Sequence, residues 1–354
     1  RKSGLRLDHV HLVSPYSKME FAYKQPKHQD WFDVKVGNVR LNDVDIPGYF
    51  STKELRVGGL WINDVLLQNL KNRKIPVEPH IVPMIYEGLQ KAPVRFKIDT
   101  ASVANFSVVY EELPVKGDKL GKLGKLYFTD MNGQFSGLTN IVSYPEQFIT
   151  LHADGNLMGS GHFTATWQLP VDSLYDRFLL DARLDSLDLL SLNEIIKPLA
   201  PAEVTSGWAQ DVVFHMDASS RKGRIRLDFP YRKLKVALLK EKDGETTQKG
   251  FLSRLANLVL RDNNPAHPER KDSKLRKVDM EIVRDPYHST FNYLWQMLRP
   301  ALVESVGVSK KEQDAALKVA GFFTKVKRFF GLDKKKDKRE EIDTNNKEIE
   351  PLKE

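Results

Sequence analysis

The stretch LRLDHVHL, residues 5–12, recurs with small changes as VRLNDVDI (39–46), LWINDVLL (60–67) and ARLDSLDL (182–189). Each copy has an apolar residue at positions one and three, Asp or Asn at position four, Val or Leu at position six, and Leu or Ile at position eight. The copies begin 34, 21 and 122 residues apart, and such irregular offsets exclude a repeat of fixed period. We therefore predict a long sheet built from similar strands.

The middle of each copy carries an irregularity. In residues 39–46, apolar and polar residues alternate as in a half-buried strand, and the alternation shifts by one residue at Asn42 and Asp43. The shift either turns the later apolar side chains to the other face or is absorbed by a bulge or bend that restores the face. Asn and Asp tolerate the backbone angles of such a bend, and Gly37 and Gly58 stand just ahead of two copies. One copy is common in any β protein, but four copies favour strands with a built-in bend.

Composition narrows the class of protein. No stretch reaches the roughly 18–20 apolar residues that a membrane-spanning helix needs, and no signal peptide is visible. Because Arg1 is not an initiator, we expect a mature form or a piece of a longer protein, and an N-terminal anchor stays open. The chain has no cysteine, which excludes disulfides, thiolate metal sites and cysteine nucleophiles. This fits an oxidising compartment such as a periplasm, although cysteine-free cytosolic proteins are not rare.

The basic charge is concentrated near the C-terminus. The formal net charge is +8, and residues 317–339 hold nine Lys or Arg against two Asp, a surplus of seven. The rest of the chain is therefore close to neutral, at about +1. A domain that binds nucleic acid through a basic surface is disfavoured.

Strand-like alternation dominates residues 1 to about 240, with mostly short polar connections. We predict antiparallel pairing, because parallel pairs need crossovers of a dozen or more residues. The segment 206–241 predicts a hairpin followed by another strand, with odd-numbered residues 213–217 on one face and even-numbered residues 212–216 on the other. Residues 71–93 contain four prolines, and only 84–90 fits a short helix there.

The last third changes character. Residues 251–259 have apolar side chains at helical spacing, with a strand in the second half of 249–264 as the alternative. Residues 289–308 predict a helix kinked at Pro300. Ser309 and Glu312 form a capping box for a further helix. From 333 onward the charged sequence predicts disorder. We expect four regions: a β region (1–245), a strand and helix region (246–308), a basic amphipathic helix (309–332) and a disordered tail (333–354).

Catalytic and metal-binding patterns are missing. His9 and His11 share a strand face and would supply half of a metal site, but no Cys and no helical His pair complements them. No phosphate-binding loop and no nucleophile elbow is present. We therefore expect no enzyme, no cofactor and no metal.

Residues 317–331 predict a helix with one aromatic and one basic face. Such a helix is typical of a membrane interface, where nearby Lys and Arg add on the order of 1 kcal/mol each toward anionic lipid. The alternative is a helix that packs its Phe side chains on the β region and leaves its basic face in water. The candidate membrane contacts are Phe322, Phe323, Lys325, Lys327, Arg328, Phe329 and Phe330.

Several segments resemble a known family. APVRFKIDTASVANFSVVYEE, GKLYFTDMNGQFSGLTN, TSGWAQDVVFHMDASSRKGRIRLDFPYRKLKVALL and RDPYHSTFNYLWQMLRPAL, with the repeated strand phrase, resemble AsmA-like proteins of bacterial envelopes. The likeness is to the C-terminal region of such proteins from Bacteroidetes-type bacteria, and it covers about 90–300 and more loosely 1–70. The N-terminal transmembrane helix and longer repetitive β region typical of the family are missing from this sequence.

The resemblance implies an elongated, curved, mainly β protein with an apolar groove, followed by amphipathic helices, and related to bridge-like lipid-transfer proteins. It implies a periplasmic protein, anchored in the inner membrane at full length, that carries phospholipid acyl chains between the membranes or assists outer-membrane assembly. The alternative is an envelope scaffold that docks a protein partner. Nucleic acid is not an expected partner. The candidate groove residues are Val39, Leu41, Val44, Ile46, Leu60, Ile62, Val65, Leu67, Leu184 and Leu187.

Overall fold

A computed structural model describes residues 3–27, 29–75, 79–114, 123–200, 202–241, 252–257 and 260–307. These residues all belong to one compact unit, Arg1–Ser309, whereas a second unit, Lys310–Glu354, lies wholly outside them. The amphipathic helix predicted over 309–332, with its candidate membrane contacts, and the predicted tail (333–354) therefore lie outside the described residues.

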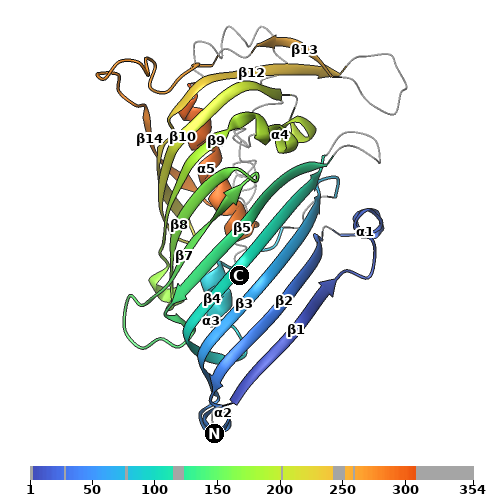
Figure 1. Ribbon diagram of the computed structural model, residues 1–354. Helices are drawn as coiled ribbons and strands as arrows, with labels where there is room; N and C mark the ends of the chain where they lie inside the picture. The colour runs from blue at the N-terminus through green and yellow to red at the C-terminus, as the bar shows by residue number, and fades with distance from the viewer. Residues whose placement is uncertain are drawn as a thin grey trace, which may run out of the picture. The chain divides into compact units, whose positions relative to one another are not determined.

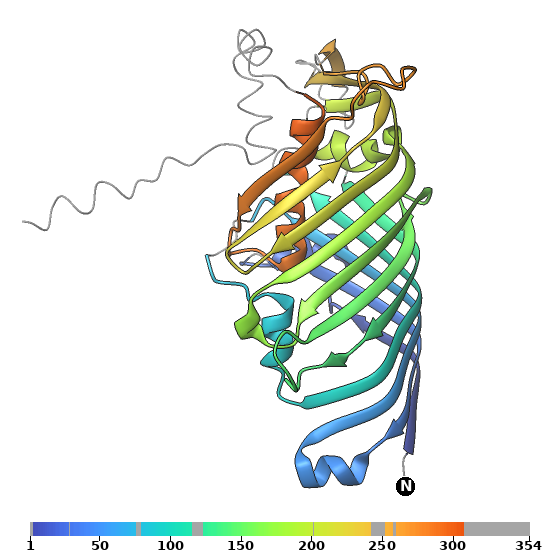
Figure 2. The ribbon, with the colours of Figure 1, turned by 90° about the vertical axis from the view of Figure 1, so that its left-hand side faces the viewer.

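The described unit is mainly β, as predicted, and is built on one large, curved sheet that does not close (Figures 1 and 2). Its strands are β1 Ser3–Val13, β2 Trp31–Val44, β3 Glu54–Asn72, β4 Arg95–Leu113, β5 Gly124–Ser136, β6 Leu138–Thr139, β7 Phe148–Leu157, β8 Gly161–Pro170, β9 Phe178–Asp188, β10 Ala202–Ala218, β11 Lys222–Asp228, β12 Tyr231–Glu241, β13 Leu252–Asn257 and β14 Lys277–Val283. Its helices are α1 Lys18–Lys24, α2 Ile46–Thr52, α3 Ile85–Gln90, α4 Asn193–Leu199 and α5 Thr290–Ser305, with 3-10 turns at Ser173–Tyr175 and Leu189–Leu192.

The strands follow one another across the sheet almost in chain order, β1-β2-β3-β4-β5-β7-β8-β9-β10-β11-β14, while β12 pairs with β10 and β13. The prediction of purely antiparallel pairing is wrong at one place, because β3 and β4 run parallel. The proline-containing segment between them is the long crossover that a parallel pair requires, and it carries α3. The sheet is therefore mixed.

Each of the first three copies of the phrase bends at its fifth position. There His9, Asp43 and Asp64 have φ angles of 56°, 54° and 58°. Gly37 and Gly58 lie opposite such bends, since a Cβ on either would come within 2.8 Å of the Cβ of Asp64 or Asp43. A side chain at these two positions would collide with the neighbouring strand.

The bends return the apolar side chains to one face, the second of the two outcomes that the sequence left open. Strand β7 pairs regularly with β8, and Leu151, Ala153 and Leu157 of β7 therefore share a face. They pair with Phe135, Gly133 and Phe128 of β5, which in turn pair with Ala101, Val103 and Val108 of β4. The same face continues through β3, β2 and β1. We call each line of directly paired residues across the strands a rung.

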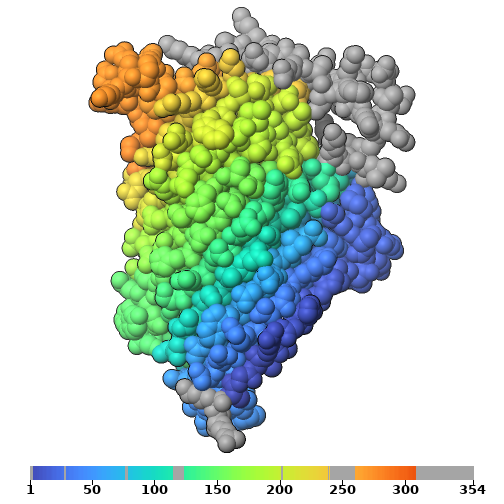
Figure 3. Space-filling model, viewed as in Figure 1, coloured from blue at the N-terminus to red at the C-terminus, as the bar shows by residue number. Residues whose placement is uncertain are grey.

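The two faces of the sheet differ in chemistry. The concave face is apolar and carries α3 and α5, which are cyan and orange in Figure 2. Over its C-terminal strands it forms the main core, in which Tyr293 and Met297 of α5 and Ile225 and Leu227 of β11 are fully buried. The convex face, which faces the viewer in Figure 3, carries mainly Asn, Asp, Thr, His and Arg side chains, and α1 packs on it over Trp31 and Leu70.

The predicted C-terminal elements are mostly confirmed. Helix α5 begins after the cap Ser289, whose hydroxyl accepts from Asn292 N at 3.3 Å, and it contains Pro300. The buried Arg284 holds its start in place by donating to the carbonyl oxygens of His288 (3.1 Å) and Val82 (2.6 Å). The hairpin of β10 and β11 is as predicted. The favoured helix at 251–259 is wrong, because Leu252–Asn257 forms strand β13. This strand lies almost entirely in the first half of 249–264, not in the second half that the alternative named.

Candidate functional site

The concave side of β1–β4 forms an apolar surface that no helix packs on in the described part of the chain. None of its side chains belongs to either buried cluster of the described residues. On β1, Leu5, Leu7 and Leu12 are 51%, 46% and 64% exposed. We call this surface the open apolar face; it comprises Leu5, Leu7, Val10, Leu12, Val34, Val36, Val39, Leu41, Leu60, Ile62, Val65, Leu67, Val103, Phe106 and Val108.

The dimensions of this face suit a long hydrocarbon chain. Neighbouring strands lie about 4.8 Å apart, so four strands span roughly 14 Å, and eight residues of strand extend roughly 23 Å. Monomeric proteins rarely leave a continuous apolar patch of several hundred Å² in water, and such patches mark sites of interaction. The open apolar face is therefore the strongest candidate site.

The sequence-predicted groove residues divide into three groups. Six of them lie on the open apolar face: Val39, Leu41, Leu60, Ile62, Val65 and Leu67. Leu187 is buried in the main core and Leu184 packs against it. Val44 pairs with Ser3 at the end of β2 and Ile46 is the first residue of α2, 47% exposed. The structure thus does not bring all ten together.

Sequence reasoning missed the contribution of β4. Residues 101–108, ASVANFSV, follow a similar pattern, with Ala104 in place of Asp or Asn at the fourth position, Phe106 at the sixth and Val108 at the eighth. Asn105 stands at the fifth position and has the same kind of backbone, with a φ of 52°. The signal was therefore present, and the fifth position of the phrase is the one that identifies it.

The concave face becomes polar toward the ends of β3 and β4. We call this region the polar end; it comprises Asn69, Lys71, Arg73, Tyr110 and Glu112. Arg73 Nε lies 2.9 Å from Glu112 Oε1, and the Tyr110 hydroxyl donates to Glu112 Oε2 at 2.7 Å. Burial, and then the charge of Glu112, raises the pKa of Tyr110.

One stripe of α5 points away from the core. Phe291 and Trp295, which are 65% and 48% exposed, precede the half-buried Arg299 at intervals of four residues, so the three share one side of the helix. Phe291 packs edge-on against Trp167 of β8 at 5.7 Å. Burial, and then the positive charge of Arg73, lowers the pKa of Arg299.

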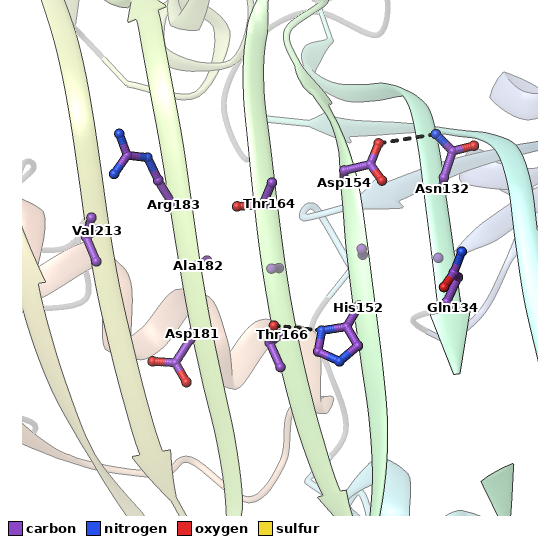
Figure 4. A pocket seen from close by; sticks show the side chains of 13 residues that line it. Asn132, Gln134, His152, Asp154, Thr164, Thr166, Asp181, Ala182, Arg183 and Val213 are labelled. Carbon is purple, nitrogen blue, oxygen red and sulfur yellow. Dashed lines mark hydrogen bonds between the residues drawn. The ribbon is translucent and has the colours of Figure 1, made fainter. Parts of the chain in front are cut away.

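The convex face holds a shallow polar hollow of about 630 Å³ (Figure 4). His152 Nδ1 lies 3.0 Å from Thr166 Oγ1, and Asn132 donates to Asp154 at 3.2 Å. Arg183 pairs with Asp211. Most of its charges are thus satisfied by neighbours on the sheet, as on an ordinary solvated face.

Within the described ranges, no group of three or more His, Asp or Glu side chains is arranged to hold a metal ion. No helix among those described has the length and apolar character to cross a membrane. No protein-family model matches the chain, and a comparison with curated proteins gives no significant match.

Proposed function

We propose that this chain is an AsmA-like envelope protein without enzymatic activity, which binds phospholipid acyl chains on its open apolar face and transfers them. The observation that carries the proposal is the continuity of the apolar rungs. The rung that supplies Leu227 to the buried core runs across the sheet to Leu7, which is 46% exposed. A surface with core composition that none of the described residues covers is suited to an apolar ligand.

The shape of the sheet supports a lipid over a flat protein partner. The sheet is curved, and its apolar side is the concave one (Figure 2). An acyl chain of roughly 20 Å fits along strands of this length. The family resemblance of the sequence points the same way, toward a periplasmic protein that moves lipid between membranes.

The proposal is tested by native mass spectrometry of the protein purified from a bacterial envelope extract, with analysis of the lipids that dissociate. We expect phospholipid in stoichiometric amount. Val103→Asp places a carboxylate on the open apolar face, and we expect it to abolish the bound lipid because a charge is costly to bury against a hydrocarbon chain.

The matched control is Ser102→Asp, one residue earlier in β4. Ser102 pairs with Trp61 and lies on the convex face, whereas Val103 pairs with Ile62 on the concave face. It should retain the lipid. Circular dichroism of both variants establishes that the sheet is intact. A folded wild-type chain without lipid, which also ignores liposomes, would favour the scaffold that docks a protein partner.

A further inference from the structure

Antiparallel pairing places alternate connections at opposite edges of the sheet, and the two edges differ in chemistry. The connections that follow β2, β5, β8, β10 and β14 lie at one edge, together with α2 and α3, which are blue and cyan in Figure 2. We call it the apolar edge, because its connections expose the large hydrophobic side chains Ile46, Phe50, Ile81, Val142, Tyr144, Leu174 and Tyr287. Leu174 is 89% and Ile81 is 73% exposed, whereas those on the described connections of the opposite edge, Tyr16, Tyr23 and Leu190, are 40–42% exposed.

Hydrogen bonds between the connections hold the apolar edge together around α3. Asn140, in the connection after β6, donates to the carbonyl oxygen of Leu89 at 3.1 Å, and the Ser173 hydroxyl lies 2.8 Å from Gln90 Oε1. A third bond, of 2.9 Å, joins the segment before α3 to the connection after β14. Because these connections are already ordered, their side chains lose little conformational freedom when they are buried against another surface.

The concave side of the sheet is apolar near this edge and polar near the other. Leu41 and Leu60, which pair on β2 and β3, lie a few residues from α2 and belong to the open apolar face. The polar end, with Lys71 and Glu112, lies where β3 and β4 end, at the opposite edge. An acyl chain that enters from the apolar edge therefore reaches the open apolar face without passing the polar end.

We propose that the apolar edge docks the protein on a lipid membrane, with its exposed side chains inserted among the lipids, so that acyl chains pass directly onto the open apolar face. The inference rests on the proposed function and deepens it, because it assigns the part of the molecule that exchanges lipid with a membrane.

The arrangement of the side chains favours a membrane over a protein partner. They project singly from separate connections, whereas a protein interface has a closely packed, continuous core. Tyr144 and Tyr287 are of the amphipathic type that is enriched at membrane interfaces. At α2, Lys53 Nζ lies 5.9 Å from the centre of the Phe50 ring, and a lysine in this position can extend its charge to the lipid headgroups while the ring stays among the acyl chains.

The test mixes the full chain with vesicles of dioleoyl phosphatidylcholine and measures the bound fraction by flotation. This lipid carries no net charge, so the basic residues within 317–339 contribute little to binding. We expect the wild type to bind and Leu174→Ser to weaken binding about tenfold, because one leucine side chain no longer leaves water. Phe50→Ser combined with Leu174→Ser should weaken it about a hundredfold.

Leu190→Ser is the matched control. Leu174 and Leu190 occupy the same position in two 3-10 turns, where their backbone N–H groups donate to Asp172 Oδ1 at 2.9 Å and to Asp188 Oδ1 at 3.0 Å. Only Leu174 lies at the apolar edge, so Leu190→Ser should bind vesicles like the wild type. An equal loss for both leucine variants, or a wild type that does not float with the vesicles, would overturn the inference.

Native mass spectrometry separates this outcome from a failure of the proposed function. Each protein is loaded with phosphatidylcholine from detergent solution, where no membrane has to be contacted. The double variant should load as much lipid as the wild type, because its open apolar face is unchanged. A double variant that loads lipid and still floats like the wild type would overturn the inference alone. A wild type that loads no lipid would overturn the proposed function.

Discussion

The two halves of the sheet are built from the same rungs but have different surroundings. Leu7 in β1 and Leu227 in β11 stand on one rung, yet the first is 46% exposed and the second is fully buried. The difference lies in α5, which packs on β11 and β14, whereas the open apolar face of β1–β4 belongs to neither buried cluster of the described unit. Apolar alternation along a strand therefore decides which side chains share a face, whereas the packing of a distant helix decides whether that face becomes core.

The largest test of this comparison is a matched pair of substitutions. Leu227→Ala leaves a cavity in a filled core and should lower the free energy of unfolding by about 2–5 kcal/mol. Leu7→Ala removes the same atoms from a half-exposed position and should cost less than about 1 kcal/mol. Urea unfolding followed by circular dichroism measures both. Equal losses would mean that the open apolar face is packed like the core.

The bends in β2 and β3, in the half of the sheet that α5 does not cover, give the next largest effect on stability. Gly37→Ala would bring its Cβ within 2.8 Å of the Cβ of Asp64 and should destabilise by about 1–3 kcal/mol, as overpacking does. Asp64→Gly removes that Cβ and also relieves a left-handed backbone. The double variant should therefore be more stable than the sum of the single effects predicts.

Gly88→Ala is the control for this cycle, because nothing lies within 4 Å of its Cβ and the residue belongs to α3. It should leave stability unchanged or raise it by up to about 1 kcal/mol. Additive effects at Gly37 and Asp64 would show that the bend does not require glycine opposite it.

The strands and their bends were predictable from the sequence, because both depend on local preferences. Period-two alternation marks the strands, and Asp or Asn at the fifth position adopts the left-handed backbone at Asp43 and Asp64. The parallel pairing of β3 and β4 was missed, since the crossover contains one short helix and several prolines instead of a long regular element.

The candidate site was predictable only in part. Six of the ten groove candidates lie on the open apolar face, but Leu187 carries the same phrase and is buried, because its coverage depends on elements elsewhere in the chain. The polar end was missed for a similar reason. Arg73 and Glu112 lie near the ends of two strands that are far apart in sequence, and no local pattern relates them.

The half of the sheet that α5 covers should also respond to alkali. Burial raises the pKa of Tyr231 to about 12, and burial likewise raises the pKa of Tyr293. Because the unfolded chain ionises first, near pH 10, the stability from Tyr231 is fully present below pH 10 and is lost as the pH rises toward about 12. Tyr231→Phe should therefore lose less stability than the wild type between about pH 10 and pH 12 in urea unfolding.

At neutral pH the same substitution should change stability by less than about 1 kcal/mol, since the Tyr231 hydroxyl is buried and has no hydrogen-bond partner in the part of the chain that the structure describes. Tyr144→Phe, at a position 60% exposed, is the control and should keep the alkaline loss of the wild type. A Tyr231→Phe variant with an unchanged pH profile would mean that this hydroxyl is accessible to water.

The smallest expected effect is a change in the quenching of tryptophan fluorescence. It distinguishes lipid binding on the concave face from lipid binding on the convex face. Trp295 on α5 and Trp208 on β10 are both 48% exposed, but Trp208 lies on the convex face, since its neighbour Ala209 pairs with the buried Leu187. Lipids with brominated acyl chains quench tryptophans that they touch. We expect Trp295→Phe to remove part of the quenching and Trp208→Phe to leave it unchanged. Equal exposure makes the pair sensitive to location alone, so quenching that depends on Trp208 would place the acyl chains on the convex face and contradict the proposed site.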